Sequence, residues 1–370
     1  MTDTPDDNAE DLLHTDTSLV YFQGIVVSTL YFHVLFSKVG AVLNVFHLIV
    51  LTRKTFITSS VNVIMIGIAS CDLFMMLQMI TSEHTPTGTD CTPPPSRLKM
   101  RLDWFFVSAR MGFRQCSAWL AVLISLITYL IITDIKNQRS RFSKPSYGIK
   151  AVASTFSLSL MLSFFYFMNY QFVQTAIWRP KATCEDYSPT WEEPIFSQKY
   201  INLFEIHDGL FSRIRLIVEG LIIKLIPSLL LPVLTGLLIY ELHKAEKKYG
   251  SSIASAARKE ARKSQNDRTT IMVIFVAISF LLSEFPTGFC EVSAAIWGDD
   301  PTAERFTTTV WFLCDAVFTA NSSLHVLLYF ALSHPYRKTV YKLLRLPFGK
   351  ANPSTFPTVP SVARISNTQL

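Results

Sequence analysis

The stretch IMVIFVAISFLLSEFPTGFC, residues 271–290, is apolar apart from one carboxylate, Glu284, and three hydroxyl side chains. A run of about 20 such residues is long enough to cross the hydrocarbon core of a bilayer as a helix. A carboxylate inside such a run is costly in lipid, and it usually faces other helices and serves binding or signalling. The stretch therefore predicts a membrane-spanning helix with a functional carboxylate near its middle.

The composition of the whole chain agrees with this interpretation. Its 370 residues are 49% hydrophobic and 17% charged, whereas soluble domains carry charge on about a quarter of their residues. Seven stretches are apolar and long enough to span a membrane: 24–51, 61–80, 103–132, 148–172, 216–240, 269–297 and 306–332. The third is weakest at its start, which contains Asp103, Arg110 and Arg114, so a bundle of six helices is the alternative.

The distribution of Lys and Arg in the loops predicts the orientation, because cytoplasmic loops are enriched in these residues. With residues 1–23 outside, the inner segments contain 20 Lys and Arg and the outer segments contain 7. We therefore predict an all-α membrane protein: a seven-transmembrane helix bundle with the N-terminus outside and the C-terminus inside. The basic inner surface suits anionic membrane lipid, and nucleic acid is not an expected partner.

The chain divides into four parts. Residues 1–23 form an acidic outer segment without the basic start of a cleavable signal peptide, and 24–332 form the seven-helix domain. Residues 333–346 are basic and amphipathic, which predicts a helix along the membrane surface. Residues 347–370 are rich in Ser, Thr and Pro and predict a disordered cytoplasmic tail. The protein is expected in the plasma membrane as a multi-pass protein.

Cysteine usage predicts one disulfide and no metal centre. Four of the six cysteines lie inside predicted spans, whereas Cys91 and Cys184 lie in outer loops, in an oxidising compartment. We predict a disulfide between these two. No C-x-x-C or H-E-x-x-H spacing is present, and the intramembrane carboxylates lack a nucleophilic companion, so an enzyme is not predicted.

Polar groups at similar depth in the inner halves of the spans predict a hydrated cluster. Asp72 and Asn321 each lie eleven residues from the inner end of their span, or roughly 16 Å deep at 1.5 Å per residue, and Asn44 lies somewhat shallower. Separate interhelical hydrogen bonds are the alternative. Pro227, Pro232 and Pro286 lie within the fifth and sixth spans, where they predict bends that either permit motion or are tolerated kinks.

Several longer strings give the chain a family resemblance. The strings SVNVIMIGIASCDL (60–73), IIKLIPSLLLPVLTGLLIYELHKAEK (222–247), DRTTIMVIFVAISFLLSEFPTGF (267–289) and NSSLHVLLYFALSHPYRKTV (321–340) resemble the nematode serpentine receptors of class W. That class lies within the rhodopsin-type G-protein-coupled receptors and is similar to the FMRFamide and myosuppressin peptide receptors.

The resemblance implies roles for single residues. Asp72 matches the family's sodium-binding aspartate, with Ser117 and Asn321 where helpers usually stand, so Na⁺ is the one cofactor it suggests. Phe280 and Pro286 match the sixth-helix switch. Asn321 opens the seventh-helix motif, which reads NSSLH here with His325 in place of the usual tyrosine.

The chain also departs from the family pattern. Thr128 stands where the third helix usually carries the arginine of its D/E-R-Y motif, and Glu284 replaces a tryptophan two residues before Pro286. Asp103 stands where the third-helix cysteine is expected, so the outer disulfide must use Cys91. The missing arginine places the usual lock of the inactive state in doubt.

The carboxylates predict a cationic ligand. Glu284 and Glu291 lie two turns apart on one helix face, and Asp315 has a similar outer depth. The outer segment 185–208 adds Glu185, Asp186, Glu192, Glu193, Glu205 and Asp208 against one lysine, Lys199. We expect Glu284 or Glu291 to pair with the arginine of a peptide ending in Arg-Phe-amide. The alternative is that Glu284 is protonated, or bonded to a neighbouring helix, and rigidifies the switch.

The leading function is therefore a receptor that couples an extracellular peptide to heterotrimeric G proteins. A chemosensory receptor for an environmental small molecule is the alternative, and a ligand-gated channel or transporter is a weaker one, since internal repeats are absent. The predicted G-protein face consists of Arg258, Lys259, Arg262 and Lys263, for which a solvated basic surface near lipid is the alternative. The C-terminal NTQL has Thr368 and Leu370 at the spacing of a PDZ ligand.

Overall fold

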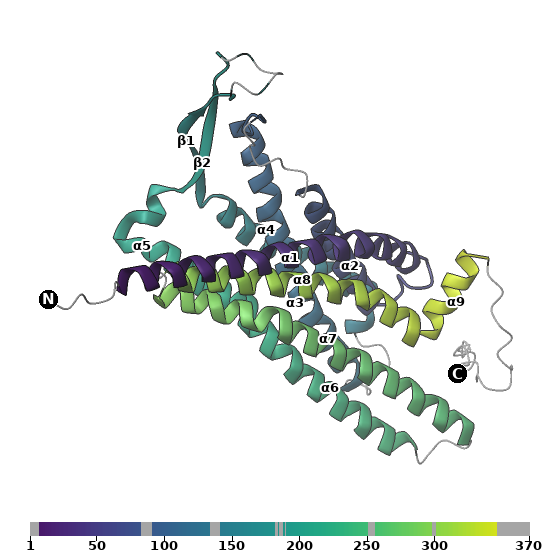
Figure 1. Ribbon diagram of the computed structural model, residues 1–370. Helices are drawn as coiled ribbons and strands as arrows, with labels where there is room; N and C mark the ends of the chain where they lie inside the picture. The colour runs from purple at the N-terminus through teal and green to yellow at the C-terminus, as the bar shows by residue number, and fades with distance from the viewer. Residues whose placement is uncertain are drawn as a thin grey trace.

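The computed structural model of the protein describes residues 7–82, 91–133, 141–181, 184, 188, 190–250, 256–297 and 301–345. Its helices form a bundle with an outer hairpin on one side (Figure 1). The helices are α1 Asp7–Leu51, α2 Ser60–Ser82, α3 Arg97–Thr133, α4 Pro145–Phe167, α5 Asn202–Ile217, α6 Ile226–Gly250, α7 Ala256–Trp297, α8 Pro301–Leu332 and α9 His334–Leu343. The hairpin strands are β1 Tyr170–Trp178 and β2 Glu193–Tyr200, and a short 3₁₀ turn, η1 Arg141–Ser143, precedes α4.

Seven helical segments in this part of the chain are apolar and long enough to cross a membrane, as the sequence predicts. The fifth of them is continuous through α5, a π-helical stretch Val218–Leu225 (η2) and α6. Many large apolar side chains on these segments are exposed, including Val42, Phe165 and Leu282. Such a surface is unfavourable in water and matches hydrocarbon, so a multi-pass membrane protein is the consistent interpretation.

The core lies where the apolar faces of α2, α3, α6, α7 and α8 meet. Ile64, Leu120, Leu231 and Phe280 are buried there, and Phe318 of α8 completes the cluster. A second apolar cluster at the inner end joins α1, α2 and α9 around Tyr336, which has no exposed surface. Both clusters join segments distant in sequence, which fixes the order of the helices around the bundle.

α9 is the surface helix predicted over 333–346, and the structure shows what holds it. Ser333 caps its N-terminus by accepting from Tyr336 N at 3.4 Å. The Tyr336 hydroxyl lies 2.8 Å from His47 Nδ1 of α1, and burial raises the pKa of Tyr336, so this phenol stays neutral. Lys338 and Lys342 remain exposed on the opposite side, where they can meet anionic headgroups.

The boundaries of the third and fourth spans differ from the prediction. α3 begins at Arg97 rather than 103, and α4 ends at Phe167, whereas the sequence predicts a span to 172. The reason is local: Tyr170, Phe172 and Val173 favour a strand, and Tyr170–Trp178 pairs with Glu193–Tyr200 as an antiparallel hairpin. No strand is predicted from the sequence in this outer segment.

The base of the hairpin is fixed to the bundle by aromatic contacts. The paired Tyr170 and Tyr200 rings stack with centroids 4.3 Å apart. Trp104 of α3 packs edge-on against Tyr170 at 4.9 Å and donates its Nε1–H to Phe167 O at 3.1 Å. The hairpin therefore starts from a rigid connection between the outer ends of α3, α4 and α5.

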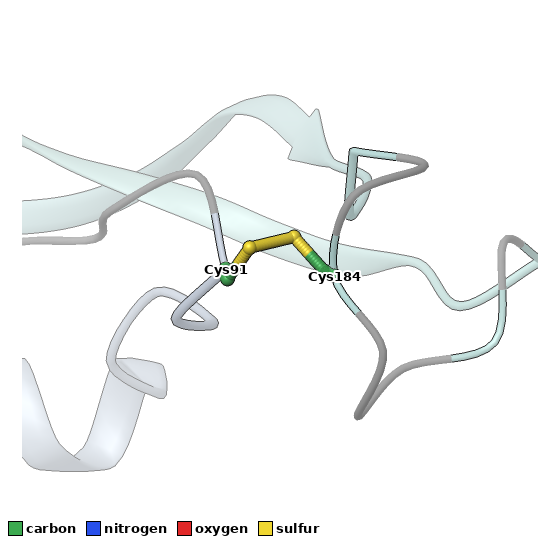
Figure 2. The surroundings of a disulfide bond; sticks show 2 residues. All are labelled: Cys91 and Cys184. Carbon is green, nitrogen blue, oxygen red and sulfur yellow. A yellow bond between two sulfur atoms is a disulfide. The ribbon is translucent and has the colours of Figure 1, made fainter.

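Cys91 and Cys184 form a disulfide across 93 residues, the pair expected from the sequence (Figure 2). Cys91 precedes α3, and Cys184 lies in the connection between β1 and β2. The bond therefore ties this connection to the outer end of α3. The four other cysteines are buried and free.

Candidate functional site

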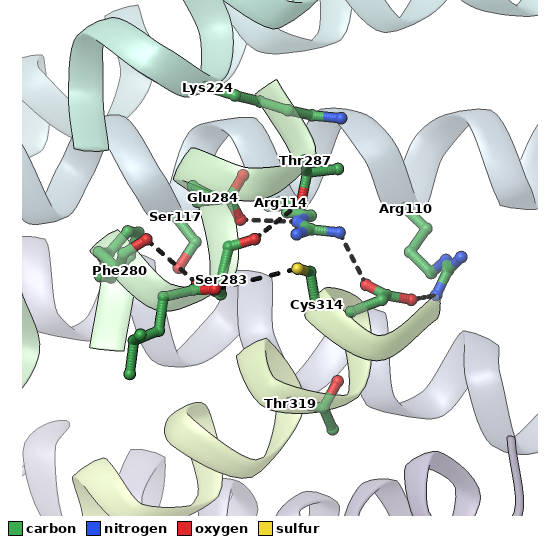
Figure 3. A network of polar contacts seen from close by, with 12 residues as sticks. Arg110, Arg114, Ser117, Lys224, Phe280, Ser283, Glu284, Thr287, Cys314 and Thr319 are labelled. Carbon is green, nitrogen blue, oxygen red and sulfur yellow. Dashed lines mark hydrogen bonds and ion pairs between the residues drawn. The ribbon is translucent and has the colours of Figure 1, made fainter. Parts of the chain in front are cut away.

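Two arginines of α3 and two carboxylates form a buried ion-pair network in the outer half of the bundle (Figure 3). Arg114 donates from Nε to Glu284 Oε1 of α7 at 2.8 Å and from Nη1 to Asp315 Oδ1 of α8 at 2.9 Å. Arg110 donates from Nη1 to Asp315 Oδ2 at 2.7 Å. All four side chains are at most 10% exposed. The network therefore connects three helices through charge-assisted hydrogen bonds.

The network extends to α1 and to the aromatic core. His33 Nδ1 of α1 lies 3.6 Å from Asp315 Oδ2, and its Nε2 lies 2.8 Å from Thr319 Oγ1. The Arg114 guanidinium lies 5.1 Å from the centre of the Phe318 ring, a distance typical of a cation–π contact. Phe318 in turn packs edge-on against Phe280 at 5.8 Å. The Phe318 ring therefore connects the ion pairs of Arg114 with the predicted switch residue Phe280.

A second ion pair lies between η2 and α7. Lys224 Nζ bonds to Glu291 Oε1, whereas Glu291 Oε2 is buried and has no hydrogen-bond partner among the described residues. The backbones come close here because Gly220 faces Gly288: a Cβ on Gly220 would lie 2.7 Å from Gly288 O. The small residues therefore allow the contact that brings Lys224 to Glu291.

The three carboxylates predicted to bind the ligand thus lie in one region, but all of them have cationic partners from other helices. Glu284 is bonded to a neighbouring helix, as in the alternative interpretation, and Asp315 uses both oxygens. The prediction missed Arg110 and Arg114, which weaken the third span by composition. Their spacing of four residues, which places them on one helix face, was the available signal, and charge balance inside a membrane demands such partners.

Two buried donors and one buried acceptor of this region remain open within the described part of the chain. Arg110 Nε, Arg114 Nη2 and Glu291 Oε2 have no hydrogen-bond partner. An unsatisfied buried polar atom is costly, so these three atoms mark where a polar ligand would gain most. The two arginine donors of α3 could be paired by an acceptor such as a carbonyl oxygen. The Glu291 oxygen of α7 could be paired by a hydrogen-bond donor or a cation.

The outer acidic segment is partly neutralised. Glu192 of this segment accepts from Arg179 Nε at 2.9 Å across the hairpin. The sequence-based prediction set Lys199 alone against the acidic residues of this segment. Arg179 precedes the segment in sequence, but it faces the segment in the fold. The side chains of Glu185, Asp186, Glu205 and Asp208 lie outside the described residues.

The predicted sodium site is deeper in the bundle. Asp72 accepts from Ser117 Oγ at 2.8 Å, and both side chains are buried. Asn321 is also buried, and its Oδ1 has no hydrogen-bond partner among the described residues. Asn44 instead donates to Gly40 O at 3.0 Å and to Met76 Sδ at 3.6 Å, which matches the separate hydrogen bonds kept as an alternative. Carboxylate, hydroxyl and amide oxygens are the ligands that hard cations prefer.

The remaining predicted switch residues lie along α7 and α8. Pro286 lies inside α7, which continues through it as one helix. His325 of α8 has a buried Nε2 with no hydrogen-bond partner in the described part of the chain, and its ring lies 6.5 Å from that of Phe275 of α7. Thr128 donates to Ile124 O of its own helix at 2.7 Å, so it does not replace the interhelical lock.

The predicted inner surface can be placed only in part. The first turns of α7 contain Arg258, Lys259, Arg262 and Lys263, ahead of the span predicted over 269–297. Their side chains lie outside the described residues, as do the tail 347–370 and its Thr368 and Leu370. Among the residues that can be described, no group of three or more His, Cys, Asp or Glu could hold a metal ion.

Comparison with known proteins agrees with this architecture. The family model described as "Serpentine type 7TM GPCR chemoreceptor Srw" matches residues 31–347. The "G-protein coupled receptor dmsr-1" of Caenorhabditis elegans is 23% identical over 305 residues, covering 73% of this chain and 59% of the relative. The chain thus spans about three fifths of the length of that relative.

Proposed function

Because the chain belongs to the Srw family of serpentine seven-transmembrane G-protein-coupled receptors, we propose that it carries the signal of an extracellular cationic peptide to heterotrimeric G proteins. It is a multi-pass protein of the plasma membrane, and a receptor rather than an enzyme. The proposed ligand class rests on the site, whereas the proposed coupling rests on the family.

The observation that carries the ligand class is the open set of polar atoms around the ion pairs. Glu291 Oε2 is a buried acceptor with one face unused, while Arg110 Nε and Arg114 Nη2 are unused donors. A peptide with an arginine side chain offers a cation for Glu291, and its backbone carbonyls offer acceptors for the arginines. A ligand with only one of these groups would leave the other atoms unpaired.

A conformational change caused by binding at this position would be transmitted to the inner side through α7. That helix carries Glu291, Pro286 and Glu284, and it continues to the basic residues beginning at Arg258. A ligand that competes for Glu291 changes the contact between η2 and α7, and one that engages Arg114 changes the contact from α3 to both α7 and α8. Such a ligand shifts the receptor toward a conformation in which these contacts differ.

The test is guanine-nucleotide exchange in membranes that contain the receptor and G proteins, with amidated peptides ending in Arg-Phe-amide as agonists. Glu291→Gln should lower the potency of a cationic agonist by at least about tenfold, since a hydrogen bond to a charged group is worth about 1.5 kcal/mol or more. Glu304→Gln is the matched control, because Glu304 is exposed at the start of α8.

Unchanged potency in Glu291→Gln would refute the role of this carboxylate. Agonists that are all neutral or anionic would refute the cationic ligand, and an ion current without nucleotide exchange would refute the coupling. The family description as a chemoreceptor favours a second candidate, an environmental small molecule with the same cation and acceptor. Activation by such a compound, without response to any peptide, would select it.

We also propose that Asp72, Ser117 and the open Asn321 Oδ1 hold a sodium ion. The support is that Asn321 Oδ1 is buried without a hydrogen-bond partner in the described part of the chain, and that Asn321 and Asp72 each lie eleven residues from the inner end of their predicted spans. When bound, the ion would neutralise Asp72 and satisfy Asn321 together.

A further inference from the structure

A cavity of about 250 Å³ lies between α4 and the segment formed by α5 and η2, with α3 behind it. Its wall is apolar and includes Leu162, Phe165, Phe211 and Ile214. The side chains of Phe165, Phe211 and Ile214 are 61%, 43% and 48% exposed, respectively. Since they belong to segments that cross the membrane, this exposed surface faces acyl chains, and the cavity opens toward the bilayer.

One part of the cavity wall is a built polar surface. Arg215 donates from Nη1 to Glu219 Oε2 at 2.9 Å and, with the Asn169 amide oriented by its hydrogen bonds, from Nε to Asn169 Oδ1 at 3.2 Å. The Arg215 guanidinium also lies 5.4 Å from the centre of the Tyr166 ring. Asn169 and Glu219 are 1% and 6% exposed. The charge of Arg215 is therefore already compensated within the protein.

One lining atom still needs a partner. Gln115 Oε1 of α3 is buried and has no hydrogen-bond partner among the described residues. A buried carbonyl oxygen accepts from an N–H or O–H group, and leaving it unpaired is costly. The cavity thus combines one open acceptor, a neutralised ion pair and an apolar wall toward lipid.

We propose that this cavity binds a neutral amphipathic lipid of the outer leaflet, whose headgroup N–H or O–H donates to Gln115 Oε1. Its acyl chain lies along Phe165 and Ile214. Pockets for drug-sized ligands measure about 300–1,000 Å³, so the cavity encloses the headgroup and the first part of the chain, and the remainder lies in the bilayer. A fatty acid anion is excluded, because its carboxylate would meet Glu219 and find Arg215 already paired.

The test uses the purified receptor in phosphatidylcholine nanodiscs and a photoreactive N-acylethanolamine, which carries both an amide N–H and a hydroxyl. Crosslinking should map to α4 or α5. Ile214→Trp fills the cavity and Gln115→Leu removes the acceptor, and each should lower labelling by at least about tenfold. Ile217→Trp is the matched control, because Ile217 is 40% exposed on the same helix and does not line the cavity.

Competition experiments distinguish a specific binding site from nonspecific binding to an apolar surface. Unlabelled N-acylethanolamine should displace the probe, whereas the free fatty acid and the alkane of equal chain length should not. Equal competition by either of these, labelling outside α4 and α5, or full labelling of Ile214→Trp would overturn the proposal. Ile214 is on the surface of the bundle, so this variant gives an answer even where Gln115→Leu fails to fold.

Discussion

Asp315 is the residue on which the buried network depends most, because among the carboxylates that the structure describes only Asp315 pairs with two arginines. Asp315→Asn removes the carboxylate that pairs with Arg110 and one of the two carboxylates that pair with Arg114. After Glu284→Gln, by contrast, the Arg114 guanidinium still bonds to Asp315. Removing one partner of a buried pair costs about 3–5 kcal/mol. We therefore expect Asp315→Asn to lower the thermal unfolding midpoint of the purified receptor more than Glu284→Gln does. The reverse order would show that Asp315 is not the centre of the network.

Asp72 is the residue that tests the sodium proposal. Asp72→Asn removes the charge that would attract the ion, so agonist affinity in this variant should no longer change between sodium and a large organic cation. Asn321→Ala should weaken the sodium effect without abolishing it, because one oxygen ligand of the three is lost. The measurement is ligand competition at equal ionic strength. An unmutated receptor whose agonist affinity never responds to sodium would contradict the proposal.

The sequence predicted which carboxylates lie buried within the bundle better than it predicted their partners. Glu284, Glu291 and Asp315 stand out because charge is rare in apolar runs, and they do lie together. Their partners could not be assigned, since pairing depends on how α3 is rotated about its axis, and a rotation of one residue, about 100°, would point Arg114 elsewhere. Of the predicted sodium ligands, Ser117 contacts Asp72, and the resemblance supplied that pairing rather than any local pattern.

At the scale of the elements, the contact between η2 and α7 requires a close approach of two backbones, and Gly220 can be used to test this requirement. Gly220→Ala would place a Cβ 2.7 Å from Gly288 O and 2.8 Å from Val292 Cγ2, and a backbone carbonyl cannot move unless α7 moves. We expect a loss of about 1–3 kcal/mol in stability. Gly236→Ala on α6 is the control, because a Cβ there meets nothing within 4 Å and alanine favours a helix by up to about 1 kcal/mol.

Thermal unfolding of both glycine variants measures this difference. Equal stability of Gly220→Ala and the unmutated receptor would mean that η2 and α7 can separate without cost. It would also predict that the ion pair between Lys224 and Glu291, which joins η2 to α7, opens readily.

The elements were predictable in number but not in detail. Seven apolar runs predicted seven spans because hydrocarbon thickness sets a minimum length. The hairpin and η2 were not predicted, since strand pairing between Tyr170–Trp178 and Glu193–Tyr200 joins segments that a turn-rich connection separates. A π-helical stretch has no composition of its own, although Pro227, two residues after it, lacks the N–H that a regular helix would use.

For the whole molecule, the orientation places the basic start of α7 on the inner side, where a G protein would bind. Charge reversal of Arg258, Lys259, Arg262 and Lys263 together should lower agonist-stimulated nucleotide exchange. Binding of ligand at the cell surface should remain unchanged, because the ion pairs lie at the other end of the helices. The two readouts separate a lost G-protein contact from misfolding, and unchanged exchange would favour the alternative of a basic surface that only attracts lipid.

The hairpin has a consequence for how such receptors diverge from a common ancestor. Its base is fixed by Tyr170, Tyr200 and Trp104, whereas the connection between β1 and β2 lies beyond these contacts. Insertions and deletions in that connection therefore leave the seven helices in place, as surface loops generally tolerate. Natural variation can alter what reaches the mouth of the bundle while the buried charges, which must balance as a set, stay constrained. Paralogues of this chain should accordingly differ in the length of this outer connection before they differ in the charge balance of the core.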